Sequence, residues 1–236
     1  MRIYSKTHKG YVRSNNQDAL LINVNAYGVA DGMGGHQGGE TASSAAVQVV
    51  TAALQGKTPN AKTLKTALDA ANRRIFMMGR DDSTLFGMGT TFTMLWEAPD
   101  AMWIAHVGDS RAYLCRDGEL ICKTEDHSMI AELLKNNLIT KEAAKTHPYK
   151  NVITRAVGID PAVDIDILQA EKKVGDIWLI CSDGLYNMVR DEQIAEVLMN
   201  LHGEAAAEKL LELALENGGA DNISFVLGVV TEAAEA

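Results

Sequence analysis

Long apolar runs and paired cysteines are both missing from this chain of 236 residues. The longest apolar stretches, such as 223–230, are far too short to cross a bilayer, and the first residues lack the apolar core of a signal peptide. Three cysteines, Cys115, Cys122 and Cys181, lie in apolar, strand-like segments without Cys-x-x-Cys spacing. We therefore expect a cytoplasmic protein, in a reducing compartment, with no membrane partner.

Clusters of basic residues are missing as well. The chain carries 31 acidic and 22 basic side chains, for a net charge of −9, and no basic stripe is visible. Without such a stripe we expect no nucleic-acid partner. The acidic balance does not exclude a phosphate substrate, because bound divalent cations reverse the local sign of a carboxylate cluster.

Linkers, internal repeats and low-complexity segments are also missing, so we expect one domain over residues 1–236. The 47% hydrophobic content is enough to fill a single large core. The Ala- and Glu-rich end after Val230 is expected to be a frayed tail.

The periodicity of apolar residues predicts an α+β fold. Helices are expected at 39–54, 61–78, 128–135, 140–145, 191–201 and 204–216, and strands at 26–30, 91–96, 102–107, 111–115, 120–123, 177–181 and 223–230. Asn60 is the predicted N-cap of the second helix, and Gly79 is expected just beyond its end. Strands in consecutive hairpins and helices in pairs predict two antiparallel sheets packed as a sandwich with the helices outside.

Four aspartates lie at the end of a short apolar run or just before one: Asp31, Asp109, Asp183 and Asp221. A carboxylate at the end of a buried strand is desolvated unless a positive charge compensates it, so four such sites suggest a shared cation. Ligands that are all oxygen favour Mg²⁺ or Mn²⁺, whereas zinc would normally recruit Cys or His, and neither clusters here.

A simpler interpretation applies to each aspartate taken alone. Asp-Gly and Asp-Asn pairs mark turns after strands, because these residues tolerate tight backbone geometry. That interpretation is preferred for any single site, but not for all four together.

Seven short motifs follow one another along the chain: Arg13 with Asn16-Gln17-Asp18, Val29-Ala30-Asp31-Gly32-Met33-Gly34-Gly35, Gly89-Thr90-Thr91, Val107-Gly108-Asp109-Ser110-Arg111, Ile153-Thr154-Arg155-Ala156-Val157-Gly158, Cys181-Ser182-Asp183-Gly184-Leu185 and Asp221-Asn222-Ile223-Ser224. In this order they closely resemble the motifs of metal-dependent serine/threonine protein phosphatases of the PP2C (PPM) type, bacterial branch. The resemblance covers residues 2–230.

This resemblance implies a central sandwich of two antiparallel sheets flanked by helix pairs, with a binuclear Mn²⁺ or Mg²⁺ centre at one edge. The family pattern implies that Asp31 bridges the two metals and that the Gly32 carbonyl ligates the second. It also implies that Asp183 and Asp221 hold the first metal. In bacterial relatives a third, looser metal is common, and here Asp109 with Asp183 would supply its ligands.

The implied reaction is hydrolysis of phosphoserine or phosphothreonine by a metal-activated water, without a phosphoenzyme. Asp18 would orient that water. Arg13 is the candidate clamp for the phosphate oxygens, because its planar fork suits two oxygens at once. Without the neighbouring motif, Arg13 would instead be read as an exposed, solvated arginine.

Two positions depart from the family pattern. Animal members carry His after the first Asp-Gly, where it is thought to protonate the leaving oxygen, and this chain has Met33. His36 is close in sequence, but a lone loop histidine is more often simply solvated. Gln17 replaces a Glu of some relatives, which removes a carboxylate from the second metal.

Residues 127–158 resemble the flap of bacterial relatives, which lies beside the metal centre and influences substrate choice. The short predicted helices and His147-Pro148 suggest a surface excursion with this role.

The expected partners are phosphorylated proteins, including a cognate Ser/Thr kinase, and the chain is expected to act as a monomer. A phosphatase of small phosphomonoesters and a catalytically silent phosphoprotein-binding module on the same fold stay open as alternatives.

Overall fold

Two antiparallel β-sheets pack face to face in the computed structural model, which describes residues 1–35 and 38–232. The first sheet has the order β1 (Arg2–His8), β11 (Ile223–Val229), β10 (Ile177–Cys181), β7 (Arg111–Arg116) and β8 (Glu119–Cys122). The second has the order β2 (Asp18–Ile22), β3 (Ala26–Met33), β5 (Phe92–Glu97), β6 (Ala101–Val107) and β9 (Asp166–Glu171), and β4 (Gly89–Thr90) pairs with the end of β3.

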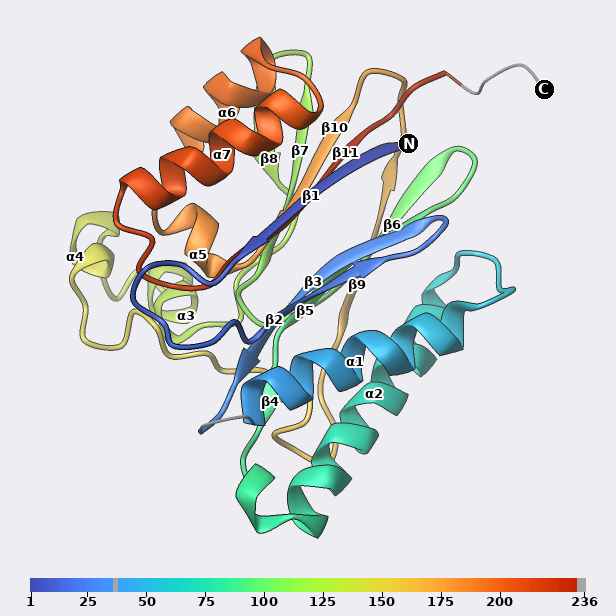
Figure 1. Ribbon diagram of the computed structural model, residues 1–236, viewed down its shortest axis with the longest axis vertical. Helices are drawn as coiled ribbons and strands as arrows, with labels where there is room; N and C mark the ends of the chain where they lie inside the picture. Colours follow the sequence, from blue (N-terminus) through green and yellow to red (C-terminus); the bar gives the residue numbers. More distant parts are fainter. Residues whose placement is uncertain (36–37, 233–236) are drawn as a thin grey trace.

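A pair of helices covers the outer face of each sheet (Figure 1). The helices α1 (Gly38–Leu54) and α2 (Ala61–Asp81) cover the second sheet, and α6 (Asp191–Asn200) and α7 (Glu204–Glu216) cover the first. The predicted α+β sandwich flanked by helix pairs is therefore confirmed.

Strand alternation divides the interior into three apolar layers. In β10, Trp178 and Ile180 point between the two sheets, whereas Leu179 and Cys181 point toward α6 and α7. Since successive side chains of a strand face opposite ways, a strand buried on both faces needs an unbroken apolar run. This explains why the sequence of β10 was recognisable as a strand.

Three local features differ from the sequence predictions or were missed by them. Gly79 lies inside α2 rather than beyond it, and glycine suits the position because the backbone of Leu85 passes close by and would stand 3.1 Å from a Cβ. The strand β9 was missed because it is half-exposed and polar. The single turn α5 (Asp183–Tyr186) was also missed, whereas Asn60 caps α2 as predicted by accepting from Thr63 N at 2.8 Å.

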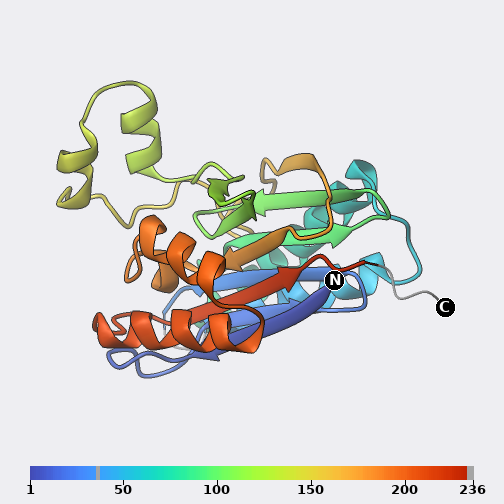
Figure 2. The ribbon, with the colours of Figure 1, turned by 90° about the horizontal axis from the view of Figure 1, so that it is seen from above.

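The middle of segment 127–158 projects from the sandwich and carries α3 (Met129–Lys135) and α4 (Lys141–Lys145), as Figure 2 shows, whereas Val157 at its end is buried in the core. Ser128 and Thr140 cap these helices. The base of the segment is tied to the core where His127 N donates to Gly108 O at 2.7 Å. Because Gly108 precedes the predicted metal ligand Asp109, this hydrogen bond places the start of the segment beside the metal site.

Two sequence predictions fall on residues outside the described part of the chain. These are the assignment of His36 as a solvated loop histidine and, for residues 233–236, the frayed tail. Within the described residues, none of the helices is both long enough and apolar enough to cross a bilayer.

The buried Asn72 links α2 to the Gly158 motif, which yields a stability prediction. Its Oδ1 accepts from Gly158 N at 2.7 Å, and its Nδ2 donates to Asp160 O at 3.0 Å. Asn72→Ala leaves both backbone groups without this partner, so we expect a melting temperature lower by about 5 °C. In thermal denaturation the exposed neighbour Arg73→Ala should be nearly neutral, and equal melting of both variants would contradict the role of Asn72.

Candidate metal centre

The ends of several strands meet at one edge of the sandwich and carry the predicted carboxylates there. Asp18, the first residue of β2, is paired with Asp31 near the end of β3. Ser182 N donates to Ser224 O at 2.9 Å, which places the end of β10 beside the start of β11. Asp183 and Asp221 stand just outside these two ends, and Asp109 lies between β6 and β7.

A pocket of about 230 Å³ collects most of the predicted site residues. Its lining consists of Arg13, Gln17, Asp31, Gly32, Met33, Gly34, Asp109, Asn151, Ile153, Asp183, Asp221 and Asn222. Asp18 does not line the pocket and lies behind Asp31 in the β2–β3 ladder. Each of the other predicted residues opens onto the same space, although they come from segments far apart in the sequence.

The carboxylates disfavour one another's ionisation. Burial raises the pKa of Asp18 and of Asp109 to about 6, and it raises the pKa of Asp183 to about 8, with further contributions from neighbouring carboxylates. Burial, followed by the charge of Asp18, also raises the pKa of Asp31 well above its usual value. Like charges directly opposite on neighbouring strands are destabilising, so the site without a compensating cation is electrostatically strained.

The donor set fits hard divalent cations. Oδ1 of Asp18 and Oδ1 of Asp109 are buried without a hydrogen-bond partner, which leaves acceptor oxygens at or beside the pocket. Carboxylate and carbonyl oxygens are the ligands that Mg²⁺ and Mn²⁺ prefer. A cation would satisfy these oxygens and neutralise the repulsion together.

The cage is not closed as it stands, because two of the carboxylates hold other partners. Among residues 1–35 and 38–232, no group of three or more Asp, Glu, His or Cys side chains already forms a cage for a metal ion. Oδ2 of Asp221 accepts from Arg13 at 2.7 Å, and Oδ2 of Asp183 accepts from Asn187 at 3.0 Å. Binding a cation through these two oxygens would compete with the hydrogen bonds from Arg13 and Asn187.

The Gly89-Thr90-Thr91 motif fixes the backbone of Asp31. The Asp31 carbonyl accepts from Thr90 Oγ1 and from Thr91 N, each at 2.9 Å, and Asp31 N donates to Thr91 Oγ1 at 2.9 Å. Ser182 Oγ in turn donates to Oδ2 of Asp18 at 2.9 Å. Thr90, Thr91 and Ser182 stand within recognisable motifs, but nothing in the sequence indicated these roles for them.

Asn222 holds the Arg13 loop against Asp221, a role that was not predicted from the sequence. Its Oδ1 accepts from Gln17 N at 2.8 Å, and its Nδ2 donates to the carbonyls of Lys9 and Asn15 at 2.9 Å. The sequence offered one indication of this role, because Asn222 directly follows Asp221 in a recognised motif.

The approach of backbone to the pocket demands glycine at position 32. A Cβ on Gly32 would lie 2.1 Å from Gly39 O and 2.6 Å from Gln17 O. Because glycine has no side chain, the backbone at Gly32 can pack directly against Gly39 at the start of α1. Met33 lines the pocket, and no histidine of residues 1–35 and 38–232 is among the lining residues.

A sequence profile described as "Protein phosphatase 2C" matches residues 7–216. The chain belongs to the protein phosphatase 2C family. It is 37% identical over 235 residues to the serine/threonine protein phosphatase PstP of Mycobacterium tuberculosis, and the match covers 98% of this chain but only 45% of PstP. It is 36% identical to the serine/threonine phosphatase stp of Listeria monocytogenes, with 94% of this chain and 93% of stp covered.

Solved structures of family members share the fold. The crystal structure of the M. tuberculosis phosphatase PstP/Ppp superposes with a TM-score of 0.92 at 36% identity, and it covers 98% of this chain and 99% of that one. A second structure, of the PstP catalytic domain in complex with two manganese ions, superposes with a TM-score of 0.90 and covers 98% of each chain.

The raised pKa values predict how pH affects the stability of the metal-stripped protein. Because burial raises the pKa of Asp183 to about 8, the native state binds more protons than the unfolded state between about pH 4 and pH 8. The contribution of Asp183 to stability is therefore lost as pH rises through this window. In EDTA at pH 8, we expect Asp183→Asn to raise the melting temperature by at least about 2–4 °C, with little effect near pH 4.

The exposed Asp164→Asn serves as the matched control and should give the same difference from wild type at every pH. The melting temperatures of wild type, Asp183→Asn and Asp164→Asn are measured by thermal denaturation in EDTA from pH 4 to pH 8. An Asp183→Asn variant that is less stable than wild type at pH 8 would show that the carboxylate is not electrostatically strained.

Proposed function

We propose that the chain hydrolyses phosphoserine and phosphothreonine in proteins, with a pair of Mn²⁺ or Mg²⁺ ions held at the Asp31 pocket. The observation that carries this proposal is the meeting of Asp31, Asp109, Asp183 and Asp221 with Arg13 in one pocket. The membership in the protein phosphatase 2C family and the two manganese ions of the PstP structure support it.

Five residues would hold the ions. Asp31 would bridge them, the Gly32 carbonyl would ligate one, Asp183 and Asp221 would ligate the other, and Asp109 with Asp183 would form a weaker third site. When bound, the ions supply Lewis acidity and lower the pKa of water, so that a nucleophile is available at neutral pH.

Arg13 and Asp18 would act on the substrate and on water. Once Asp221 serves as a ligand, the guanidinium of Arg13 is released from its 2.7 Å contact and can donate to two phosphate oxygens. Asp18 is held through Oδ2 by Ser182, and its partnerless Oδ1 would accept a hydrogen bond from the attacking water. Among the residues that the structure describes, which do not include His36, no histidine lines the pocket, and we propose that water protonates the leaving seryl or threonyl oxygen.

The surroundings of the pocket favour a protein substrate over a small phosphomonoester. A groove of about 680 Å³ leads from Asp109 and Asp183 between the flap and α5, and is lined by Ile130, Leu134 and Tyr186 among others. A groove of this size can hold a peptide segment. The silent binding module is disfavoured because the candidate ligands are all present.

The cellular setting is also part of the proposal. Cys115, Cys122 and Cys181 are free thiols, which suits the reducing cytoplasm. We propose that the chain acts there as a monomer on phosphorylated proteins that include a cognate Ser/Thr kinase. Sedimentation and co-expression with candidate kinases test these two points.

Loss of a bridging carboxylate should be far more damaging than loss of the arginine. We expect Asp31→Asn and Asp183→Ala to lower kcat/KM by more than about 1000-fold and Arg13→Ala by about 10- to 100-fold, because the arginine supplies only part of the positioning. Release of phosphate from a phosphothreonine peptide with Mn²⁺ measures this, and Asp164→Asn is the control. Activity that survives both chelation and Asp183→Ala would refute the mechanism.

The flap hypothesis predicts a change of preference without loss of chemistry. Asn151 and Ile153 of the segment line the metal pocket, so its sequence shapes what reaches the site. Replacing residues 127–158 with the corresponding segment of the Listeria phosphatase should change the ranking of phosphopeptides while hydrolysis of a small aryl phosphate stays within about threefold. An equal loss on both substrates would count against this role.

A further inference from the structure

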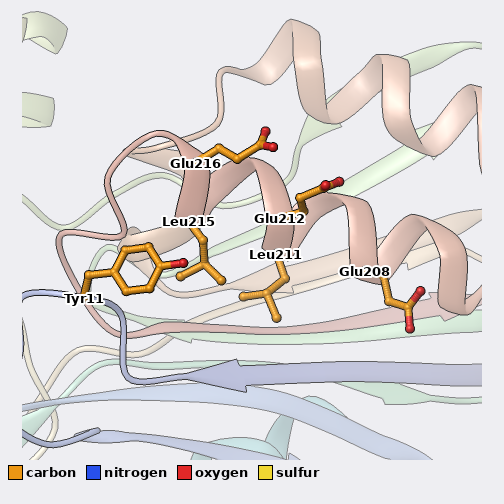
Figure 3. A pocket seen from close by; sticks show the side chains of 6 residues that line it. All are labelled: Tyr11, Glu208, Leu211, Glu212, Leu215 and Glu216. Carbon is orange, nitrogen blue, oxygen red and sulfur yellow. The ribbon is translucent and has the colours of Figure 1, made fainter.

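A second pocket, of about 490 Å³, lies along α7 outside the metal centre (Figure 3). Its lining residues are Tyr11, Glu208, Leu211, Glu212, Leu215 and Glu216. We call it the α7 groove. It combines an apolar floor with a row of acidic side chains.

The apolar floor is open to solvent at its Tyr11 end. The side chain of Tyr11 is 68% exposed, and Figure 3 shows its ring beside Leu215. Gly219 completes the contact, because a Cβ there would lie 3.1 Å from both Leu215 Cδ2 and Tyr11 Cδ2. The ring is thus held in place on one side and uncovered on the other, which suits docking of an apolar side chain.

The acidic row works against the helix that carries it. Glu208, Glu212 and Glu216 follow one another at i, i+4 spacing, where like charges repel. The last turn of α7 contains no basic residue, so Glu216 also faces the negative end of the helix dipole. Residues that oppose local stability in this way are expected where a partner supplies the compensating charge.

The direct ion pairs lie toward the far end of the groove from Tyr11. Lys6 lies 3.9 Å from Glu208, and Lys209 pairs with Glu212 at 2.6 Å. Within the described part of the chain, Glu216 forms no direct ion pair, although it also interacts electrostatically with Lys209. An incoming Lys or Arg would therefore meet a carboxylate without a direct ion pair across α7 from the apolar floor (Figure 3).

Both ends of the chain segment at the Tyr11 end of the α7 groove lead directly into loops of the metal centre. Tyr11 N donates to Gly219 O at 2.8 Å, and Tyr11 stands two residues before Arg13. The segment that follows Glu216 leads within five residues to Asp221. A chain lying in the groove therefore passes beside the loops that carry the phosphate clamp and a metal ligand.

We propose that the α7 groove docks phosphoprotein substrates through an apolar side chain next to a Lys or Arg. The apolar side chain lies on Leu211, Leu215 and Tyr11, and the basic side chain pairs with Glu216. This inference rests on the proposed phosphatase function and adds a substrate feature that is separate from the phosphoresidue.

Phosphothreonine peptides with three different arms test the proposal. All share one phosphorylated core and a flexible linker, and the arm contains Leu and Arg, Leu and Glu, or Ser and Arg. The enzymes are wild type, the double variant Glu212→Lys/Glu216→Lys, and the control Glu192→Lys/Glu196→Lys, which makes the same charge change at exposed positions of α6. Each rate is divided by the rate of the same enzyme on a small aryl phosphate, which cancels differences in folding.

In wild type and in the α6 control, we expect the Leu–Arg arm to lower KM about tenfold relative to both other arms, with kcat unchanged. The α7 double variant should lose this preference and favour the Leu–Glu arm. An equal KM for all arms in wild type, or a preference that survives in the α7 variant or is lost in the α6 control, would overturn the proposal.

Direct binding separates this inference from the proposed function. Fluorescence anisotropy of the unphosphorylated Leu–Arg arm measures docking without hydrolysis, on the same three proteins. If no protein releases phosphate, the function fails, and selective binding to wild type and the α6 control still supports the groove. If phosphate is released but the arm binds all three proteins equally or none of them, the groove fails alone.

Discussion

The mutual repulsion of buried carboxylates at one edge of the sandwich is the constraint on which the rest of the structure depends. Asp18 and Asp31 face each other across the β2–β3 ladder, and the charges of Asp109, Asp183 and Asp221 act on the same small space. Low-dielectric surroundings make such a group unfavourable unless cations compensate it. Because bound cations would relieve this repulsion, the same edge is expected to bind divalent ions tightly.

The scaffold resists this repulsion through hydrogen bonds to the backbone, in addition to those that Ser182, Asn187 and Arg13 donate to carboxylate oxygens. Thr90 and Thr91 hold the main chain of Asp31, and Asn222 ties the Arg13 loop to the start of β11. Side chains held this way keep oxygens available at the pocket while the backbone stays fixed. The antiparallel order is what makes it possible, because each strand end at this edge lies beside the start of its neighbour.

The sequence predicted those features of the fold and the site that depend on neighbouring residues, and it did not predict those that depend on tertiary contacts. The aspartates and glycines stand in local motifs, and buried strands such as β10 are unbroken apolar runs, so fold class and candidate ligands were accessible. The half-exposed β9 has no such run, and Gly79 reflects the close approach of the Leu85 backbone rather than the end of α2. The pairing of Arg13 with Asp221 and the bridging by Asn222 join residues about 200 positions apart, which no local pattern reveals.

Calorimetric titration of Mn²⁺ into metal-stripped protein tests the central claim most directly, because it counts ions without relying on turnover. The account predicts two tightly bound ions per chain, the number in the PstP complex, and the loss of both in Asp31→Asn. The melting temperature should rise as the sites fill. Fewer than two ions in wild type, or undiminished binding in Asp31→Asn, would contradict the claim that these carboxylates are held together for a shared pair of cations.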